Sequence, residues 1–273
     1  MSDELRANPR PRTTGGTVDI LMYHSIAEAP GPTSIAPSVF EAQMTALAAS
    51  GLKVLRMDDV PNHLANGLDR AVAITFDDGF RDFAEVAWPV LRHLSLPAMV
   101  YLPTDCIDGT ERWKGAHQPP RPLLSWNEVR RLASEGVDFG NHTATHPDLS
   151  RLDVKEVAAE TERADVRMKA ETGLRPVHFA PPYGRASLVA RDVIARHHRT
   201  SVGARLATAH SSSDPYDLPR IEMFYYTNLR RWRAHLEGRG IPYLCFRRAL
   251  RQIRTSILSK ASRILSCKSL ITY

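Results

Sequence analysis

The apolar run Ala71-Val72-Ala73-Ile74-Thr75-Phe76 constrains the fold of this 273-residue chain more than any other feature. The run is short, continuous and rich in β-branched residues, without the polar alternation of a strand that has one face in water. Such a strand is covered on both faces, as in the parallel sheets of α/β proteins. The run ends at Asp77-Asp78-Gly79. Because ligands of α/β folds collect beyond the carboxyl ends of strands, we expect these carboxylates to lie in a site.

Asp77 and Asp78 place two negative charges side by side. A divalent cation would explain this arrangement, because it binds one carboxylate as a ligand and lowers the cost of ionising the other. The alternative is a helix N-cap, since aspartate before a helix is common and needs no catalysis. Taken alone, the pair is compatible with both interpretations.

A second polar cluster, residues 140–147, follows a short apolar segment and contains His142 and His146. One helical turn would bring two imidazoles at this spacing onto one face. Two histidines and one carboxylate form a three-ligand metal site with an open position, which is typical of catalytic sites. A single histidine would more often be a cap or a core residue. Together with the aspartates, the cluster favours a metal site.

Three segments together resemble a known family. Their order and spacing are similar to the first three motifs of the NodB-homology polysaccharide deacetylases, carbohydrate esterase family four: Thr75-Phe76-Asp77-Asp78-Gly79, His142-Thr143-Ala144-Thr145-His146 and Ala180-Pro181-Pro182-Tyr183-Gly184. The resemblance covers about residues 17–225. It implies an α/β fold, a distorted (β/α) barrel. It also implies an enzyme that removes an N-acetyl or another N- or O-acyl group from a sugar.

The resemblance also implies roles for individual residues. Asp77 would be the general base, and Tyr183 would give its backbone N–H to an oxyanion hole, while a divalent metal would be held by Asp78, His142 and His146. Zn²⁺ suits this nitrogen and oxygen ligand set, and Co²⁺, Ni²⁺ and Mn²⁺ are alternatives because selection also depends on availability. The expected mechanism is metal-assisted hydrolysis.

The chain departs from the common pattern of the family in two places. Ala180 stands where most members have an arginine that steadies the catalytic aspartate, and no C-terminal segment after residue 220 supplies a general acid. His24, in an apolar segment near the N-terminus, is similar to the acid histidine of the circularly permuted branch of the family. We therefore expect His24 to be the acid. A half-buried strand histidine is the alternative.

The segment around Arg220 offers a substitute for the missing arginine. Arg220 follows a proline-rich loop, and we expect it to pair with Asp77 or with substrate. Asp214 or Asp217 would orient His24 and raise its pKa. A turn with solvated charges explains the same residues without any catalytic role. Pro182 is grouped with these substrate-binding or orienting residues.

Apolar runs and helical periodicities alternate along residues 17–228, which are interpreted as one catalytic domain. Strands are predicted at 18–23, 53–55, 71–76, 98–102, 137–139, 177–179 and 200–203, and helices at 38–50, 81–94, 126–135, 153–172 and 187–197. A long loop, residues 105–122, has Trp113 within it and Trp126 just beyond it. These rings would wall a sugar site by stacking, unless the loop is only a tolerated insertion.

The N-terminal residues 1–16 are interpreted as a disordered arm because of their proline, arginine, threonine and glycine content. They lack the apolar run of a signal peptide, and no stretch of the sequence is long and apolar enough to cross a bilayer. The three cysteines are scattered and odd in number, which implies no disulfide framework. We expect a cytoplasmic protein, with any membrane contact peripheral.

The tail, residues 229–273, holds eleven arginines or lysines and one glutamate, although the whole chain has a net charge of only +6. From Phe246 onward apolar residues recur at helical spacing between the basic ones, which predicts a cationic amphipathic helix. Residues 246–265 would lie on an anionic membrane, which suits a lipid-linked glycan substrate, or would pack on the barrel. Nucleic-acid binding is less favoured because no recognition motif accompanies the charge.

Three functions are compatible with these features. The first is a metal-dependent deacetylase of N-acetylated sugars in a polysaccharide or its lipid-linked precursor, as in exopolysaccharide biosynthesis. The second keeps the metal but acts on a non-sugar amide. The third is a carbohydrate-binding homologue without turnover, suggested by Ala180 and the absent C-terminal acid segment. The full set Asp77, Asp78, His142 and His146 argues against this third function.

Overall fold

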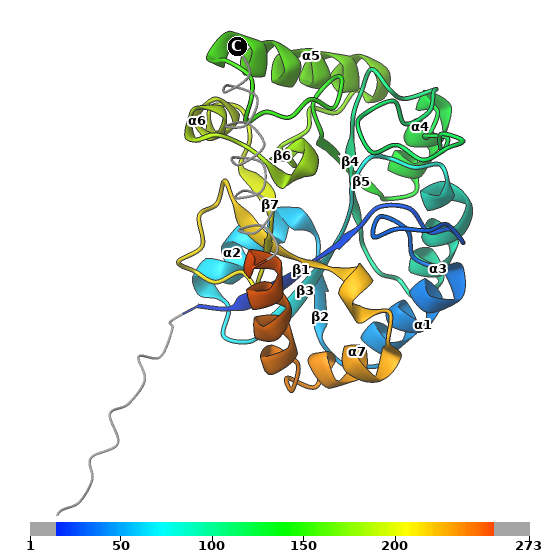
Figure 1. The fold of residues 1–273 in the computed structure, drawn as a ribbon, viewed down its shortest axis with the longest axis vertical. Helices are drawn as coiled ribbons and strands as arrows, with labels where there is room; N and C mark the ends of the chain where they lie inside the picture. Colours follow the sequence, from blue (N-terminus) through cyan, green and yellow to red (C-terminus); the bar gives the residue numbers. More distant parts are fainter. Residues whose placement is uncertain (1–14, 254–273) are drawn as a thin grey trace, which may run out of the picture.

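Seven parallel strands form a closed barrel in the structure, a computed structural model in which residues 15–253 are described (Figure 1). The strands of the sheet are β1 (Thr17–Tyr23), β2 (Lys53–Leu55), β3 (Arg70–Phe76), β4 (Met99–Leu102), β5 (Asp138–Asn141), β6 (His178–Phe179), β7 (Thr200–Leu206) and β8 (Leu218–Glu222). The ring runs β1-β8-β7-β6-β5-β4-β3, and β1 pairs with β3 to close it. β2 pairs with β3 outside the ring. The predicted α/β barrel is therefore confirmed.

The ring closes on β3, which forms the longest pairing of the sheet. Its whole length pairs with β1, from Thr17 opposite Arg70 to Tyr23 opposite Phe76. On its other edge, β2 pairs with the first half of β3, and β4 pairs with its last two residues. Every residue of β3 after Arg70 is buried, as expected of a strand without polar alternation.

Helices alternate with the strands and surround the barrel (Figure 1). They are α1 (Pro37–Ala48), α2 (Val60–Asn66), α3 (Trp88–His93), α4 (Trp126–Ser134), α5 (Val154–Thr172), α6 (Leu188–Ala195) and α7 (Leu229–Leu236). α4 begins with a capping box between Ser125 and Glu128, and α5 with one between Asp153 and Glu156. Gly173 ends α5 in the left-handed conformation, with φ of 75°.

Three elements differ from the sequence-based prediction. The helix predicted over 81–94 is divided into a π-helical turn, Phe83–Ala87, and α3. Pro89 explains the break, because it lacks the N–H that an α-helical hydrogen bond would need. α2 and β8 were not predicted. In β8, Pro219 and Arg220 interrupt the apolar pattern by which a buried strand is recognised.

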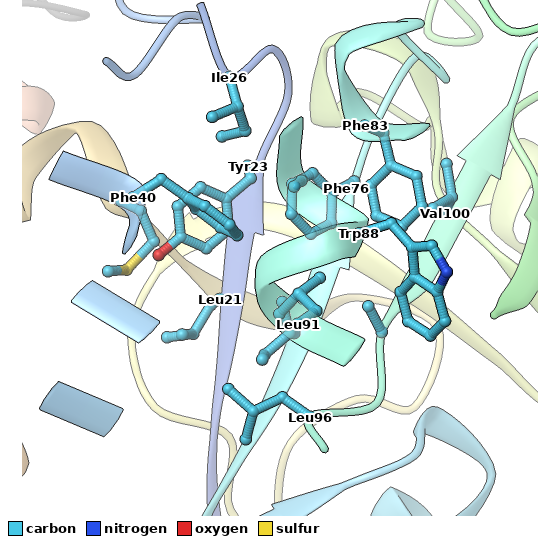
Figure 2. Packing of buried hydrophobic residues seen from close by; sticks show 14 of the residues in the cluster. Leu21, Tyr23, Ile26, Phe40, Phe76, Phe83, Trp88, Leu91, Leu96 and Val100 are labelled. Atoms are coloured by element: carbon cyan, nitrogen blue, oxygen red, sulfur yellow. The ribbon is translucent and has the colours of Figure 1, made fainter. Parts of the chain in front are cut away.

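An aromatic cluster packs between β1, β3, α1 and the helical segment after β3 (Figure 2). Tyr23 stacks on Phe76 with the ring centroids 5.2 Å apart, and Phe40 meets Tyr23 edge-on at the same distance. Phe83 packs edge-on against Phe76 at 4.8 Å. The hydroxyl of Tyr23 donates to Gln43 at 3.0 Å. These contacts fix the carboxyl ends of β1 and β3 next to each other, and with them the residues that follow both strands.

The chain continues after α7 as a helix over residues 241–253, next to α7 in Figure 1. Leu244 is buried in the main core, and the Tyr243 hydroxyl donates to the Tyr225 carbonyl at 2.8 Å. The predicted amphipathic helix is thus helical from residue 246 to 253, and residues 254–265 lie outside the described part of the chain, as do residues 1–14 of the predicted arm. Over the described residues, no helix has both the length and the apolarity to span a bilayer.

Candidate active site

Asp77 and Asp78 are buried directly beyond β3, at the rim where the strands end. The chain turns sharply here, with φ of 74° at Asp78 and 65° at Gly79. Glycine suits this turn, because the left-handed φ strains other residues and a Cβ on Gly79 would stand 2.6 Å from the Leu102 side chain. Asp82 occupies the position before the first helical turn. The helix-cap interpretation of Asp77 and Asp78 is therefore wrong.

Asp78, His142 and His146 come together in a buried cluster. The Asp78 Oδ1 atom lies 3.2 Å from His142 Nε2 and 3.1 Å from His146 Nε2. The three candidate ligand atoms all lie within 4.8 Å of one another. The structure thus contains a possible His/Asp metal site.

The chemistry of this cluster fits a divalent cation. His142 Nδ1 lies 2.6 Å from the Ala180 carbonyl oxygen and donates to it, which leaves the lone pair on Nε2, facing Asp78. Burial favours the neutral form of Asp78, but its close contacts with the imidazoles of His142 and His146 outweigh burial and hold its pKa well below the usual range. One carboxylate and two imidazole nitrogens are a donor set that Zn²⁺ accepts.

A loop, not a helical turn, brings the two histidines onto one side. Thr143 and His146 both have left-handed backbones, with φ of 70° and 63°. The Asn141 side-chain oxygen accepts a hydrogen bond from the Thr143 N–H at 2.7 Å, and the Thr143 hydroxyl accepts one from the His146 N–H at 3.0 Å. These side-chain hydrogen bonds, and not those of a helical turn, bring the two imidazoles to one side.

Helix α5 holds this loop from outside the barrel. Glu160 accepts hydrogen bonds from the N–H groups of Ala144 and Thr145, at 3.1 and 2.8 Å. Asp165 accepts one from the Asn141 side-chain amide at 2.7 Å. Glu160 and Asp165 were not predicted from the sequence. Their signal is weak, because an acidic residue in a charged helix is indistinguishable in sequence from one on a solvated face.

Arg220 forms a bidentate ion pair with Asp77. Its two terminal nitrogens lie 2.7 Å from the two carboxylate oxygens, and its Nε donates to the Gly203 carbonyl at 2.8 Å. Both side chains are buried. Burial raises the pKa of Asp77, but the charge and hydrogen bonds of Arg220 outweigh it and leave the pKa below its usual value. Arg220 thus contacts Asp77 from β8, while the position of the missing arginine is filled by the buried Ala180.

Asp214 and Asp217 lie elsewhere. Both form ion pairs with Arg191 of α6, at 3.3 and 3.0 Å. Both aspartates thus contact Arg191, whereas one of them was predicted to contact and orient His24. The prediction failed because α6 supplies a cation near the loop before β8, and sequence alone does not reveal this neighbour.

His24 follows β1, between the strands that carry Asp77 and Arg220. Its Nε2 atom lies 3.9 Å from Asp77 Oδ2, and its side chain is 17% exposed. The chain beyond it is fixed by Asp82, which accepts hydrogen bonds from the Ser25 hydroxyl at 2.5 Å and the Ile26 N–H at 2.9 Å. His24 therefore lines the same cavity as Asp77 and is not a core histidine.

The third motif forms a tight turn beyond β6. Residues Pro182–Gly184 are a short 3₁₀ segment in which Tyr183 has φ of 59°. Pro182 is buried, and the Tyr183 ring packs edge-on against His146, with centroids 4.9 Å apart. Any Cβ on Gly184 would stand 2.2 Å from Ala204, so the turn packs tightly on β7. This packing fixes the backbone of Tyr183 at the edge of the histidine pair.

The site opens into a cavity of about 300 Å³. Its lining includes Met22, His24, Asp77, Asp78, Glu111, Trp113, Lys114, Arg121, His142, His146, Tyr183, Arg220, Glu222 and Arg251. Trp113 of the long loop stacks on His146, with centroids 4.1 Å apart and planes at 25°. It also lines an adjoining cavity of about 680 Å³. Trp126 is buried in the core instead, so its predicted role in a sugar wall is wrong.

Comparison with known proteins agrees with this geometry. A family model described as polysaccharide deacetylase matches residues 65–202, about half of the chain. The chain is 35% identical over 154 residues to the chitooligosaccharide deacetylase of Bradyrhizobium sp. (strain ANU 289), covering 55% of this chain and 60% of that protein. It is 36% identical over 155 residues to the chitooligosaccharide deacetylase of Sinorhizobium fredii (strain NBRC 101917 / NGR234), with the same coverage. The chain thus matches 60% of the length of these two relatives.

The fold is also similar to a solved structure, described as Streptococcus pyogenes deacetylase PplD in complex with acetate. The TM-score is 0.66 at 23% sequence identity, covering 75% of this chain and 91% of that chain. The matched family region, residues 65–202, contains Asp77, Asp78, His142 and His146. The chain therefore belongs to the polysaccharide deacetylase family, the NodB-homology group of carbohydrate esterase family four.

Proposed function

We propose that this protein is a metal-dependent hydrolase that removes N-acetyl groups from the amino sugars of a glycan. One observation carries the proposal: a buried carboxylate paired to an arginine lies beside a separate His/Asp cluster in one open cavity. The two carboxylates of the doublet are thereby assigned to different tasks. Asp78 would hold a metal, and Asp77 remains available to reactants.

Asp77 is the general base. It accepts a proton from water as the water oxygen forms a bond to the acyl carbon. The carboxylate is ionised at neutral pH, because Arg220 keeps its pKa low despite burial. A low pKa makes the carboxylate a weak base, so its contribution depends on its fixed position, which the bidentate pair supplies.

A divalent metal, proposed to be Zn²⁺, would be held by Asp78, His142 and His146. When bound, it polarises the acyl carbonyl and lowers the pKa of water. The Tyr183 N–H is the proposed donor to the oxygen that becomes negative as the carbonyl carbon turns tetrahedral. The rigid turn around Tyr183 supports this role, since an oxyanion donor must be positioned before the reaction.

His24 is the proposed general acid. It donates a proton to the amide nitrogen as the carbon–nitrogen bond breaks, so that the sugar leaves as a neutral amine and the acyl group leaves as acetic acid, which ionises to acetate in water. Its imidazole lies 3.9 Å from Asp77, and its residue directly follows β1, the strand between β3 and β8. The acid and the base therefore face one reacting centre, and the proton removed from water is balanced by the proton given to nitrogen.

An amino-sugar substrate is proposed from the wall of the cavity and from the relatives. The Trp113 indole is held against His146, where a sugar ring would stack beside the metal cluster. Both relatives compared above are named chitooligosaccharide deacetylases. Oligomers of N-acetylglucosamine are therefore the first substrates to test.

The test measures acetate released from these oligomers by the metal-loaded protein. We expect release that chelation abolishes and Zn²⁺ restores, and a loss of at least about 1,000-fold in kcat for Asp77→Asn. Asp192→Asn, at an exposed position of α6, is the matched control. Release from a non-sugar acetamide alone would support the amide hydrolase alternative. Binding of oligomers without any release would support the non-catalytic one.

A further inference from the structure

The helix of residues 241–253 turns its apolar side chains toward solvent. Phe246, Leu250 and Ile253 are 58%, 41% and 56% exposed. Their spacing of four and then three residues places them on one face of the helix. An amphipathic helix packed on its own domain would bury this face, so the exposed stripe requires another explanation.

The opposite side of the same helix is bound to the barrel. The Arg247 guanidinium lies 4.2 Å from the centroid of the Tyr225 ring, and Leu244 is buried in the core. Arg251 lies 3.7 Å from Glu222 at the end of β8. These contacts hold the helix in one orientation, and in that orientation the three apolar side chains remain outside.

The surroundings of the stripe are strongly cationic. Residues 229–253 contain seven arginines and one glutamate, and Arg248 of the same helix is exposed on the side away from the stripe. An apolar stripe on a segment of strongly positive charge matches the boundary between the headgroups and acyl chains of an anionic bilayer. A second copy of this chain would bring like charges together, and a nucleic acid would not need the apolar stripe.

We propose that residues 241–253 form a docking surface for an anionic lipid bilayer, with Phe246, Leu250 and Ile253 in the interface. Arg251 of this helix and Glu222 both line the catalytic cavity. Docking therefore places the bilayer across this helix from the cavity. The docking itself does not depend on the proposed deacetylase function, which it would extend to glycans displayed at a lipid surface.

Vesicle flotation of the full-length protein tests the proposal without any substrate. We expect the protein to float with vesicles of phosphatidylcholine and phosphatidylglycerol, and to bind much less to phosphatidylcholine alone or at high salt. The triple variant Phe246→Ser, Leu250→Ser, Ile253→Ser should lower the partition coefficient at least about tenfold. The double variant Leu68→Ser, Leu188→Ser is the control, because these leucines are 95% and 79% exposed but lie elsewhere.

Several outcomes would overturn the proposal. Equal flotation of the triple variant and the wild type would show that the stripe plays no part in membrane binding. Failure of the wild type to float would show that the helix does not dock on a bilayer. Light scattering that shows a dimer dissolved by the triple variant would assign the stripe to self-association. Circular dichroism verifies that each variant is folded. The variant Arg248→Glu tests the proposal without altering the stripe, and it should also weaken binding to the anionic vesicles.

Discussion

Arg220 and Asp77 form a two-pronged ion pair across the barrel, with both nitrogen–oxygen distances at 2.7 Å. β1 lies between their strands, so His24 extends from the strand flanked by the two partners. Arg220 and His24 both lie outside residues 65–202, where the family model matches. The Asp77 carboxylate is thus held in place by Arg220, from a part of the chain beyond that region.

The first prediction concerns Arg220→Lys. Lysine keeps the charge but loses the bidentate geometry, so we expect kcat to fall by about 100-fold. Since Arg220 keeps the pKa of Asp77 low, its replacement should raise that pKa and move the acidic limb of the kcat/KM profile to higher pH. Arg191→Lys, a surface position paired with Asp214 and Asp217, is the control. An unchanged pH profile and kcat would remove Arg220 from the mechanism.

The second prediction concerns Glu160→Ala on α5. Glu160 binds two N–H groups of the loop between His142 and His146, so its loss should loosen the loop and weaken metal affinity about 10- to 100-fold. Isothermal titration calorimetry with Zn²⁺ measures this change in metal affinity. Glu162→Ala is the matched control, since Glu162 is exposed on the same helix. Equal affinities of the two variants would contradict a supporting role of α5.

The apolar and acidic motifs of the sequence predicted β3, the alternation of strands and helices, and the segments that carry the Asp/His cluster. They did not predict β8, because its proline and arginine disrupt the apolar pattern of a buried strand. Arg220 can be buried there because its charge is paired with Asp77, a partner that is remote in sequence. The supports of the histidine loop were also missed. Glu160 and Asp165 acquire their roles only through partners that are remote in sequence, and a periodicity cannot show such partners.

The third prediction concerns Trp113→Ala. If a sugar stacks on this ring, KM for chitooligosaccharides should rise about tenfold with a smaller change in kcat, and Trp113→Phe should recover most of the loss. Because Trp113 also stacks on His146, Zn²⁺ affinity must be measured in parallel. A loss of metal affinity with unchanged KM would assign the ring to the metal site rather than to the substrate.

The last prediction concerns stability, at a network far from the site. Asp19 of β1 is buried and binds Arg70 through Nε at 2.8 Å and His235 at 3.0 Å. Burial raises the pKa of Asp19, but the hydrogen bond and charge of His235, together with Arg70, lower it below the usual value. Breaking such a pair leaves buried partners unmatched, so Asp19→Asn should reduce the free energy of unfolding by about 3 kcal/mol at pH 7.

The sign of its pH dependence follows from linkage. Because the folded state lowers the pKa of Asp19, its contribution is complete above the unfolded pKa of about 3.9 and is lost as the pH falls through the folded value. Urea unfolding below about pH 4 should therefore show a shallower loss of stability in Asp19→Asn than in the wild type. Asp69→Asn is the control, since the Asp69 side chain is 71% exposed. Parallel curves for Asp19→Asn and the wild type would mean that Asp19 contributes through packing rather than through its charge.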